Sequence, residues 1–410
     1  MTVKGFLFDL DQTLVDSSQL LAHRRIGAWG YVMSNLHQVR PFAGSPAPHE
    51  LPGRLRVAGY KIGIVTSSVR QYAEAVLKNL GVHYDVLVAY HDTQNHKPNP
   101  EPLQKALMDL GLSPADVCHV GDDAKDHEAS YHAQVASIGA GWSGNALAWA
   151  SSCPDLLATN AAILLDPTFV AQGSYLAESL ARGSQPMLHD GWAIPCDAST
   201  IALGRYFTKS DPRHAHHALS SAILTFKDDD APAATFGRAV GEYVQRSSWR
   251  PQYIVAVPPK PNQPRNRFTA LLTHAQPWLQ GIGVYPDGLI CTKQIDGYKG
   301  MRAADREAAV RGAYQSRYTW NSGRVLLLDD VHTSSATTAE CARVLTSDGA
   351  GEVRTLVLAK DQHSFTPPRK CDRCGASMRV QNGRYGPFWS CTNWRKGDPS
   401  SCTFSADLDA

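Results

Sequence analysis

Residues 5–13 read GFLFDLDQT, a short apolar run that ends in two carboxylates. A run of this kind predicts a strand buried on both faces, as in parallel sheets. Asp9 and Asp11 follow the strand at positions i and i+2, so their side chains point the same way. Phosphoryl transfer can use one carboxylate as a nucleophile and the other as an acid and base. The stretch therefore predicts an α/β domain with phosphoryl-transfer chemistry at Asp9 and Asp11.

Three further elements follow predicted strands in the same half of the chain. Thr66 ends the run KIGIVT and offers a hydroxyl to a phosphoryl oxygen. Lys97, in HKPNPEP, offers a fixed cation for developing negative charge. The run GDD at 121–123, together with Asp126, follows DVCHV and offers carboxylates for Mg²⁺. Ligands bind at the carboxyl ends of strands in doubly wound sheets, so we expect these groups to share one site.

The order and spacing of these four elements resemble the haloacid-dehalogenase (HAD) superfamily of phosphohydrolases. The resemblance implies that Asp9 attacks phosphorus to form an aspartyl-phosphate. It implies that Asp11 protonates the leaving group and then activates water, while Thr66 and Lys97 orient and neutralise the phosphoryl group. The predicted metal-site residues for Mg²⁺ are Asp9, Asp11, Asp122, Asp123 and Asp126, and the choice between Asp123 and Asp126 stays open.

The segment between Leu14 and Tyr60 is short for a HAD protein with a separate cap domain. It contains RRIGAWGYVMSNL, which predicts one helix, and the Pro-rich stretch RPFAGSPAPHELPG. Little room remains for a cap, so we expect an open site. By analogy with the family, an open site suits bulky phosphorylated substrates such as nucleic-acid ends or proteins. The predicted partner is a phosphorylated nucleotide or a nucleic-acid end.

A second signal is VLLLDDVHTSSATTAECARVL at 325–345, which predicts a strand, an acidic pair, a hydroxyl-rich loop and a helix. A loop at a helix N-terminus offers backbone N–H groups to a phosphate. The run resembles the phosphoribosyl-pyrophosphate (PRPP) signature of type I phosphoribosyltransferases. The resemblance implies that Asp329 and Asp330 bind the ribose. The residues implied to cradle its 5′-phosphate are Thr333, Ser334, Ser335, Ala336 and Thr337.

The flanking segments resemble the competence-associated ComF-like branch of that family. IVAVPPKPNQPRNRF looks like its pyrophosphate-loop strand, with Lys260, Arg265 and Arg267 as cationic candidates. The family usually has Gly where Ser335 stands, so that the backbone can approach the phosphate. Ser335 therefore leaves two alternatives open, a transferase that uses PRPP and a non-catalytic nucleotide sensor.

Four of the nine cysteines cluster near the C-terminus, at Cys371, Cys374, Cys391 and Cys402. Four thiolates suit tetrahedral Zn²⁺, which would supply much of the folding free energy of so small a domain. The segment resembles the zinc ribbons at the C-terminal end of bacterial type IA topoisomerases. That resemblance implies binding of single-stranded DNA or RNA through stacking on aromatic side chains, and the candidates are Tyr385, Phe388, Trp389 and Trp394.

The composition is that of an ordinary globular protein, with 43% hydrophobic and 19% charged residues in 410. The net charge of +2 means that any nucleic-acid contact must come from a local basic patch. The N-terminus shows no signal-peptide pattern and no apolar run reaches the length of a membrane span, so we expect a cytoplasmic protein without a membrane partner. A homo-oligomer is compatible with the sequence. The histidines of RHAHH, at 214, 216 and 217, are interpreted as a solvated helix face.

The sequence thus predicts an α/β protein with two doubly wound parallel-sheet domains and a zinc ribbon. The predicted domains are a HAD-like phosphatase at 1–166, a phosphoribosyltransferase fold at 167–366 and a zinc ribbon at 367–410. Helices are predicted at Arg70–Leu80 and Pro100–Leu110 in the first domain and near Phe169–Ala181 after it. The leading hypothesis is a bifunctional enzyme of nucleotide or nucleic-acid processing. The alternative is a nucleic-acid-binding adaptor, or a stress, defence or competence factor, in which at most the HAD domain turns over.

Overall fold

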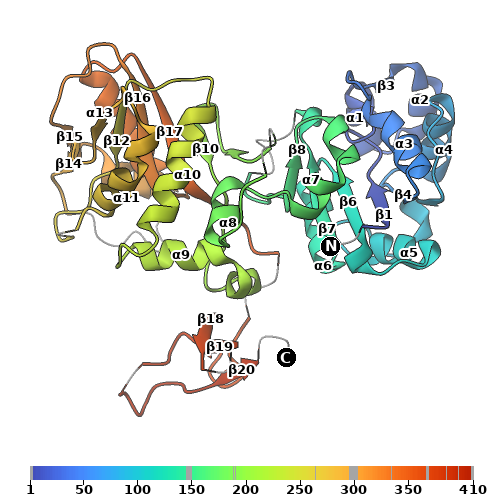
Figure 1. Cartoon of the computed structure of the whole chain (residues 1–410). Coiled ribbons are helices and arrows are strands. Elements are labelled where there is room, and N and C mark those ends of the chain that lie inside the picture. The colour runs from blue at the N-terminus through green and yellow to red at the C-terminus, as the bar shows by residue number, and fades with distance from the viewer. Residues whose placement is uncertain are drawn as a thin grey trace. The chain divides into compact units, whose positions relative to one another are not determined.

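The computed structural model describes residues 3–144, 150–187, 189, 191–263, 265–294, 303–333, 335–365, 369–384, 386–395 and 397–407. The chain divides into two compact units (Figure 1). The first is Met1–Ser174 with Pro186–Trp192, and the second is Tyr175–Gln185 with Ala193–Ala410. No helix of the described residues is long and apolar enough to span a bilayer.

The first unit is built on a six-stranded sheet in the order β5-β4-β1-β6-β7-β8, and every pair in it is parallel. This arrangement confirms the predicted α/β domain. Its strands are β1 Gly5–Phe8, β4 Lys61–Val65, β5 Val86–Val88, β6 Val117–Gly121, β7 Ala136–Ala140 and β8 Leu156–Ala158. Its longer helices are α3 Leu51–Val57, α4 Arg70–Asn79, α5 Glu101–Leu110, α6 Ala124–His132 and α7 Pro167–Gln172.

Side chains of β1 alternate between two apolar layers, because successive residues of a strand face opposite sides. Phe6 and Phe8 pack in one core with α3, α4 and α7. Leu7 packs in the other with α5 and α6. Helices therefore cover both faces of the sheet, and only the strand ends are left for a site (Figure 1).

The insert between β1 and β4 contains two short helices instead of the single helix that we predicted over RRIGAWGYVMSNL. They are α1 Leu21–Arg25 and α2 Trp29–Ser34. Gly27 separates them with a φ of 71°, a backbone conformation that helical residues do not adopt. A two-residue ladder of β2 Val15–Asp16 and β3 Arg40–Pro41 closes the base of the insert.

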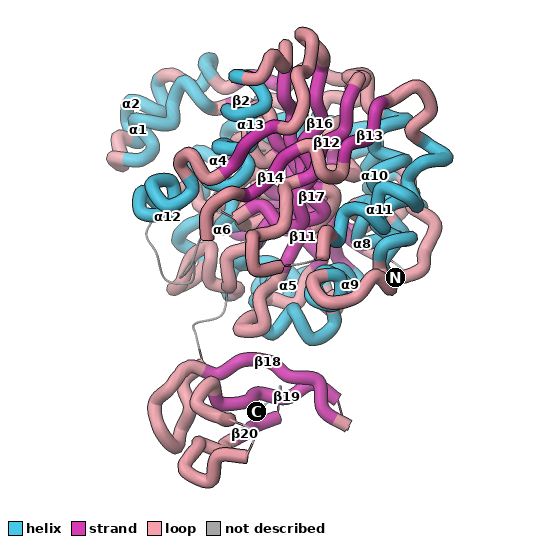
Figure 2. The backbone as a smooth tube through the Cα atoms, turned by 90° about the vertical axis from the view of Figure 1, so that its left-hand side faces the viewer, coloured by secondary structure: helices cyan, strands magenta, loops and turns pink. Residues whose placement is uncertain are grey.

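The second unit has its own largely parallel sheet, in the order β13-β12-β16-β17-β10-β9, with β11 beside β17. Figure 2 shows β12, β16 and β17 side by side in magenta. The strands are β9 Ile194–Pro195, β10 Thr200–Ala202, β11 Arg205–Tyr206, β12 Tyr253–Ala256, β13 Gly283–Tyr285, β16 Arg324–His332 and β17 Glu352–Asp361, with β14 Leu289–Cys291 and β15 Tyr314–Ser316 as a separate pair. The helices are α8 Leu176–Ala181, α9 Ala218–Phe226, α10 Ala233–Arg246, α11 Arg267–Ala275, α12 Ala303–Val310 and α13 Ala336–Ser347.

The segment 167–181 lies partly in each unit, although the sequence placed all of it in the middle domain. We expected one helix near Phe169–Ala181, but the chain forms α7 and α8 instead. Gly173 lies between them, and a Cβ at this position would lie 2.5 Å from the Phe169 carbonyl oxygen. Phe169 and Val170 pack in the core of the first unit, so the division falls after α7 and not before it.

The histidines of RHAHH do not form the solvated helix face that we predicted. They lie in a 3₁₀ turn, Pro212–His216, and at the start of α9. His214 is buried, and one of its ring nitrogens lies 2.8 Å from the Phe207 carbonyl oxygen. His217 accepts the Ser220 N–H as the cap of α9 and lies 3.4 Å from the buried Glu178. Both side chains have structural partners.

The C-terminal segment forms a three-stranded antiparallel sheet of β18 Met378–Gly383, β19 Gly386–Cys391 and β20 Ser405–Asp407 (Figure 2). Its small core contains Met378, Val380 and Trp389 together with the cysteines. Trp394 is exposed. Of the four aromatic candidates for stacking, Trp389 thus contributes to the core, Phe388 is partly buried and Trp394 faces solvent, while Tyr385 lies outside the described residues.

Candidate active site

Asp9 lies at the carboxyl end of β1, at the centre of the first sheet. β1 pairs with β4 and β6 along its whole length. The Asp9 N–H donates to the Val120 carbonyl oxygen at 2.9 Å, which fixes the loop after the strand against β6. The Asp9 carboxylate is therefore held at the edge of the sheet where ligands bind in this class of fold.

Asp9, Asp122 and Asp126 form a group that we call the carboxylate cluster. Each offers one oxygen, and these oxygens lie within 4.8 Å of one another. All three residues are buried, and the Thr13 hydroxyl donates to Asp122 at 3.2 Å. An oxygen-only donor set of this size fits Mg²⁺, which takes carboxylates and completes its shell with water and phosphate.

Lys97 reaches the carboxylate cluster from the loop before α5. Its Nζ lies 2.6 Å from Asp9 Oδ1 and 2.5 Å from Asp126 Oδ1, and it donates to the Val65 carbonyl oxygen at 3.0 Å. The ammonium group is almost fully buried. All its donors are used within the site, so the cation is fixed where a phosphoryl group would lie against Asp9.

The electrostatics of this site differ for its two paired carboxylates. Burial raises the pKa of Asp9 well above its usual value, and the Lys97 charge opposes that rise only in part. Burial would also raise the pKa of Asp126, but Lys97, His119 and His127 together outweigh it and the pKa is lowered. Burial alone would lower the pKa of Lys97, yet Asp126 and Asp9 raise it above its usual value. Lys97 is thus held as a cation.

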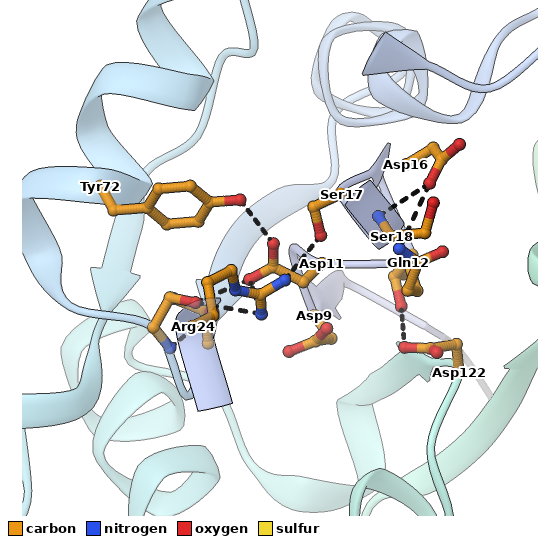
Figure 3. A network of polar contacts seen from close by, with 12 residues as sticks. Asp9, Asp11, Gln12, Asp16, Ser17, Ser18, Arg24, Tyr72 and Asp122 are labelled. Carbon is orange, nitrogen blue, oxygen red and sulfur yellow. Dashed lines mark hydrogen bonds and ion pairs between the residues drawn. The ribbon is translucent and has the colours of Figure 1, made fainter. Parts of the chain in front are cut away.

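Asp11 lies beside the carboxylate cluster and accepts hydrogen bonds on both oxygens (Figure 3). The Tyr72 hydroxyl donates to Oδ1 and the Ser68 hydroxyl to Oδ2, each at 2.7 Å. Arg24 Nη2 lies 2.7 Å from Oδ2. The sequence did not single out these three partners, because they come from the insert and from α4 and its preceding loop. Asp11 is not one of the carboxylates within 4.8 Å.

Thr66 follows β4 at the same edge of the sheet. Its N–H donates to the Val88 carbonyl oxygen at 2.9 Å, and its hydroxyl oxygen accepts the Ser68 N–H at 3.1 Å. The residue is buried. The hydroxyl proton is therefore left to donate to a ligand oxygen.

Asp123 is the candidate that the structure assigns to another role. It is exposed, and its carboxylate accepts the Lys125 N–H as the cap of α6. A carboxylate at this position stabilises the helix start. Of the two alternatives that the sequence left open, Asp126 and not Asp123 lies with Asp9 and Asp122.

A second candidate site lies at the end of β16 in the second unit. A cavity of about 370 Å³ is lined by the acidic pair and by Arg267 and Lys260, which the sequence had marked as cationic candidates. The loop residues in its lining are Thr333, Ser335, Ala336 and Thr337. Ser334 lies outside the described residues.

The acidic pair carries an unusual charge state. Arg267 Nη2 lies 2.9 Å from Asp330 Oδ2 but 4.0 Å from Asp329 Oδ1. Burial raises the pKa of Asp329 to about 7, the charge of Asp330 adds to the rise and Arg267 opposes it. Asp329 can therefore exchange a proton near neutral pH when the cavity holds no ligand.

Ser335 precedes α13 with a φ of 55°, in the left-handed region that favours glycine. This agrees with the expectation that a glycine suits the position. His332 also lines the cavity, and its Nδ1 is buried without a hydrogen-bond partner in the described part of the chain. The sequence did not mark His332, because a histidine at a strand end has no distinctive pattern.

The four C-terminal cysteines come together with their sulfur atoms within 4.8 Å. Cys371 and Cys402 sulfurs lie 3.6 Å apart, and those of Cys374 and Cys391 lie 3.5 Å apart. Both separations are far too long for a disulfide. They are close to the edge of about 3.8 Å expected for a tetrahedron with Zn–S bonds of about 2.3 Å. The cluster therefore fits a zinc ion.

Comparison with known proteins matches residues 24–140 to the haloacid dehalogenase-like hydrolase family. Pyrophosphatase PpaX of Bacillus mycoides is 30% identical over 184 residues, which cover 35% of this chain and 85% of the relative. Pyrophosphatase PpaX of Bacillus velezensis is 27% identical over 181 residues, with 34% and 84% covered.

Solved structures give matches of the same kind. The HAD phosphatase of Thermococcus onnurineus is 20% identical with a TM-score of 0.29, over 33% of this chain and 86% of that one. The β-phosphoglucomutase of Clostridium difficile is 16% identical with a TM-score of 0.32, over 42% and 96%. The relative in Bacillus mycoides decides the assignment, because the match covers 85% of its length at 30% identity. Through its N-terminal unit, this chain belongs to the haloacid dehalogenase-like hydrolases.

Proposed function

We propose that the first unit is a Mg²⁺-dependent phosphohydrolase with Asp9 as its nucleophile. The observation that carries the proposal is the placement of Asp9 within the carboxylate cluster and 2.6 Å from the Lys97 ammonium. Mg²⁺ held by Asp9, Asp122 and Asp126 would neutralise phosphoryl charge. Lys97 and Thr66 would bind the phosphoryl oxygens.

In the first step an Asp9 oxygen bonds to phosphorus while the bond from phosphorus to the leaving-group oxygen breaks. Asp11 gives its proton to that leaving oxygen. In the second step Asp11 takes a proton from water, the water oxygen bonds to phosphorus, and the bond to Asp9 breaks. Inorganic phosphate leaves, and Asp9 and Asp11 return to their starting states.

The substrate would be a phosphorylated nucleotide, a nucleic-acid end or a diphosphate. The short insert supports an open site. The alignment with the Bacillus mycoides relative supports an open site too. It is 184 positions long but contains only 35% of the 410 residues of this chain, so the relative has residues that this chain lacks. Diphosphate is the substrate that the names of the two pyrophosphatase relatives indicate.

A phosphate-release screen tests this proposal on the full-length protein with Mg²⁺. The substrates are inorganic diphosphate, nucleotides, sugar phosphates and oligonucleotides phosphorylated at either end, and the control is Asp9→Asn. We expect release by the wild type and a loss of at least about a thousandfold in the variant. Equal release by both proteins would sink the proposal.

For the second unit we propose binding of PRPP or a ribose 5-phosphate group at the end of β16. The acidic pair, the loop before α13 and the left-handed Ser335 support this proposal. Transfer of the ribose phosphate would release diphosphate, a substrate class considered for the first unit. A transferase and a nucleotide sensor are both compatible with the cavity.

Isothermal titration with PRPP separates these alternatives from the adaptor hypothesis. Saturable binding that Asp330→Asn weakens by about tenfold or more is expected, because a ribose hydroxyl would lose an ionised acceptor. No heat of binding, together with tight binding of single-stranded oligonucleotide, would favour the adaptor.

For the C-terminal segment we propose a structural zinc ion and contact with single-stranded nucleic acid. The sulfur separations support the zinc, and the exposed Trp394 supports a stacking contact. Metal analysis of the purified protein should give one zinc per chain, lost in Cys391→Ser. The affinity for a single-stranded oligonucleotide, measured by fluorescence anisotropy, should fall about tenfold in Trp394→Ala. Unchanged affinity would argue against the stacking contact.

A further inference from the structure

Arg24 is a charged residue of the insert that reaches back to the catalytic carboxylates. It lies in α1, and its side chain is 15% exposed. Nη2 lies 2.7 Å from Asp11, Nη1 donates to the Ser17 hydroxyl at 2.6 Å, and the guanidinium lies 5.5 Å from the centre of the Tyr72 ring. Figure 3 shows Arg24 and Tyr72 converging on Asp11.

The guanidinium is not fully used by these contacts. Its Nε is buried and has no hydrogen-bond partner in the described part of the chain. A buried N–H without a partner is costly, so its presence at a site indicates a missing acceptor. Nε and a neighbouring Nη form the planar fork that binds two oxygens of a phosphate at once.

The position of Asp11 defines which part of a substrate Arg24 would meet. In the proposed function Asp11 protonates the leaving oxygen, so the leaving group must come within hydrogen-bond distance of Asp11. Arg24, at 2.7 Å from Asp11, is therefore on the leaving-group side of the bond that breaks. Lys97, in contrast, lies against Asp9 on the side of the transferred phosphoryl group.

We propose that Arg24 is a specificity residue that binds a second phosphate on the leaving group. This inference rests on the proposed function and narrows its substrate class to phosphoric anhydrides, of which inorganic diphosphate is the smallest. The transferred phosphoryl group bonds to Asp9 beside Lys97. The second phosphate takes over part of the contact that the Arg24 guanidinium makes with Asp11.

The test compares two substrates of the full-length protein with Mg²⁺. Inorganic diphosphate has a phosphate as its leaving group, whereas p-nitrophenyl phosphate has none there. Arg24→Met keeps an unbranched apolar stem and removes the charge, and Arg24→Lys keeps the charge without the planar fork. Tyr72→Phe is the matched control, because it removes a neutral donor to Asp11 and keeps the ring that faces the Arg24 guanidinium, whereas the Ser68 hydroxyl also contacts Arg24.

We expect Arg24→Met to lower the ratio of kcat/KM for diphosphate to that for p-nitrophenyl phosphate by about tenfold to a hundredfold, mainly through KM. Arg24→Lys should restore part of the ratio. Tyr72→Phe should change kcat/KM for both substrates by the same factor, since the lost hydroxyl acts through Asp11.

Equal losses on both substrates in Arg24→Met would overturn the proposal and leave Arg24 as a positioning residue for Asp11. A wild type that hydrolyses p-nitrophenyl phosphate but not diphosphate would overturn it as well. Failure of the proposed function is distinguishable, because the wild type would then hydrolyse neither substrate faster than Asp9→Asn. Thermal unfolding of each variant checks that it is folded.

Discussion

The two units place carboxylates at the ends of buried parallel strands, but they balance the charge in opposite ways. In the first unit the Lys97 ammonium lies between Asp9 and Asp126, at 2.6 and 2.5 Å. In the second unit Arg267 pairs with Asp330 and stays 4.0 Å from Asp329, whose pKa burial raises to about 7. Burial raises the pKa of one carboxyl at each site, Asp9 in the first and Asp329 in the second, but only the first site has a buried cation in contact with both of its paired carboxylates.

Under the two proposed functions, this difference would separate a reaction centre from a binding pocket. A group that must attack phosphorus benefits from charges fixed before the substrate arrives. A pocket that receives hydroxyl groups can leave one carboxyl unpaired until the ligand supplies donors. The same edge of a parallel sheet thus supports two kinds of site, according to which cations the loops supply.

Removal of Lys97 should give the largest change in stability. In Lys97→Met two buried carboxylates lose their cation, and we expect a loss of about 3–5 kcal/mol in the free energy of unfolding of the first unit. Mg²⁺ should restore part of this loss by binding the carboxylate cluster. Urea unfolding with and without Mg²⁺ measures both effects.

Lys105→Met is the matched control, because Lys105 pairs with Asp109 on the exposed side of α5. We expect a change of less than about 1 kcal/mol there. Similar losses in the two variants would mean that the buried contacts of Lys97 stabilise the fold no more than an exposed ion pair does. The contrast between the units would then fail.

Asp329 should give an intermediate effect that depends on pH. Its pKa in the folded state is raised above the ordinary 3.8, so folding favours the protonated form. The resulting stabilisation is present below pH 3.8 and is lost as the pH rises through about 7. Asp329→Asn should remove this loss, which we expect to be on the order of 2 kcal/mol.

The measurement is hydrogen exchange of β16 peptides across a urea series at pH 5 and pH 7.5. Between pH 5 and pH 7.5 the wild type should lose more stability than the variant does. Identical pH dependence in the two proteins would show that Asp329 is ionised throughout, and the distinction drawn between the sites would not hold.

Ser335→Gly should give the smallest effect. Glycine relieves the left-handed backbone at this position, so we expect a gain of about 0.5–1 kcal/mol in the stability of the second unit. Ser335→Ala keeps the Cβ and should show no gain. PRPP titration of the same variants shows whether the serine side chain also narrows the phosphate loop; a loss of stability in Ser335→Gly would contradict the backbone argument.

Much of the first site could be predicted because most of its residues directly follow strands. Strand ends of a parallel sheet meet at one edge, so the sequence alone is enough to place Asp9, Thr66 and Asp122 together, whereas Lys97 comes from the longer loop between β5 and α5. The predicted helices at 70–80 and 100–110 are confirmed as α4 and α5. Both have an apolar face and no internal glycine to interrupt them.

The parts that escaped prediction depend on the backbone or on long-range contacts. Gly27 and Gly173 divide segments whose apolar pattern favours one helix. The contact of Arg24 with Asp11 requires the insert to fold back on the strand end, which no local pattern records. Asp123 and Asp126 are both plausible ligands by spacing, and only the start of α6 decides between them.

In the proposed reaction Asp9 carries the phosphoryl group during turnover. The most direct test is acid quenching of Asp11→Asn during hydrolysis of p-nitrophenyl phosphate. Its leaving group departs without a proton, so the first step can proceed without Asp11, while loss of the group that activates water should let the phosphorylated enzyme accumulate. We predict a peptide containing residues 5–13 with the mass of one added phosphoryl group on Asp9, absent from the Asp9→Asn and Asp11→Asn double variant. Phosphate release by the wild type with no phosphoryl group on Asp9 in the quenched variant would contradict the account.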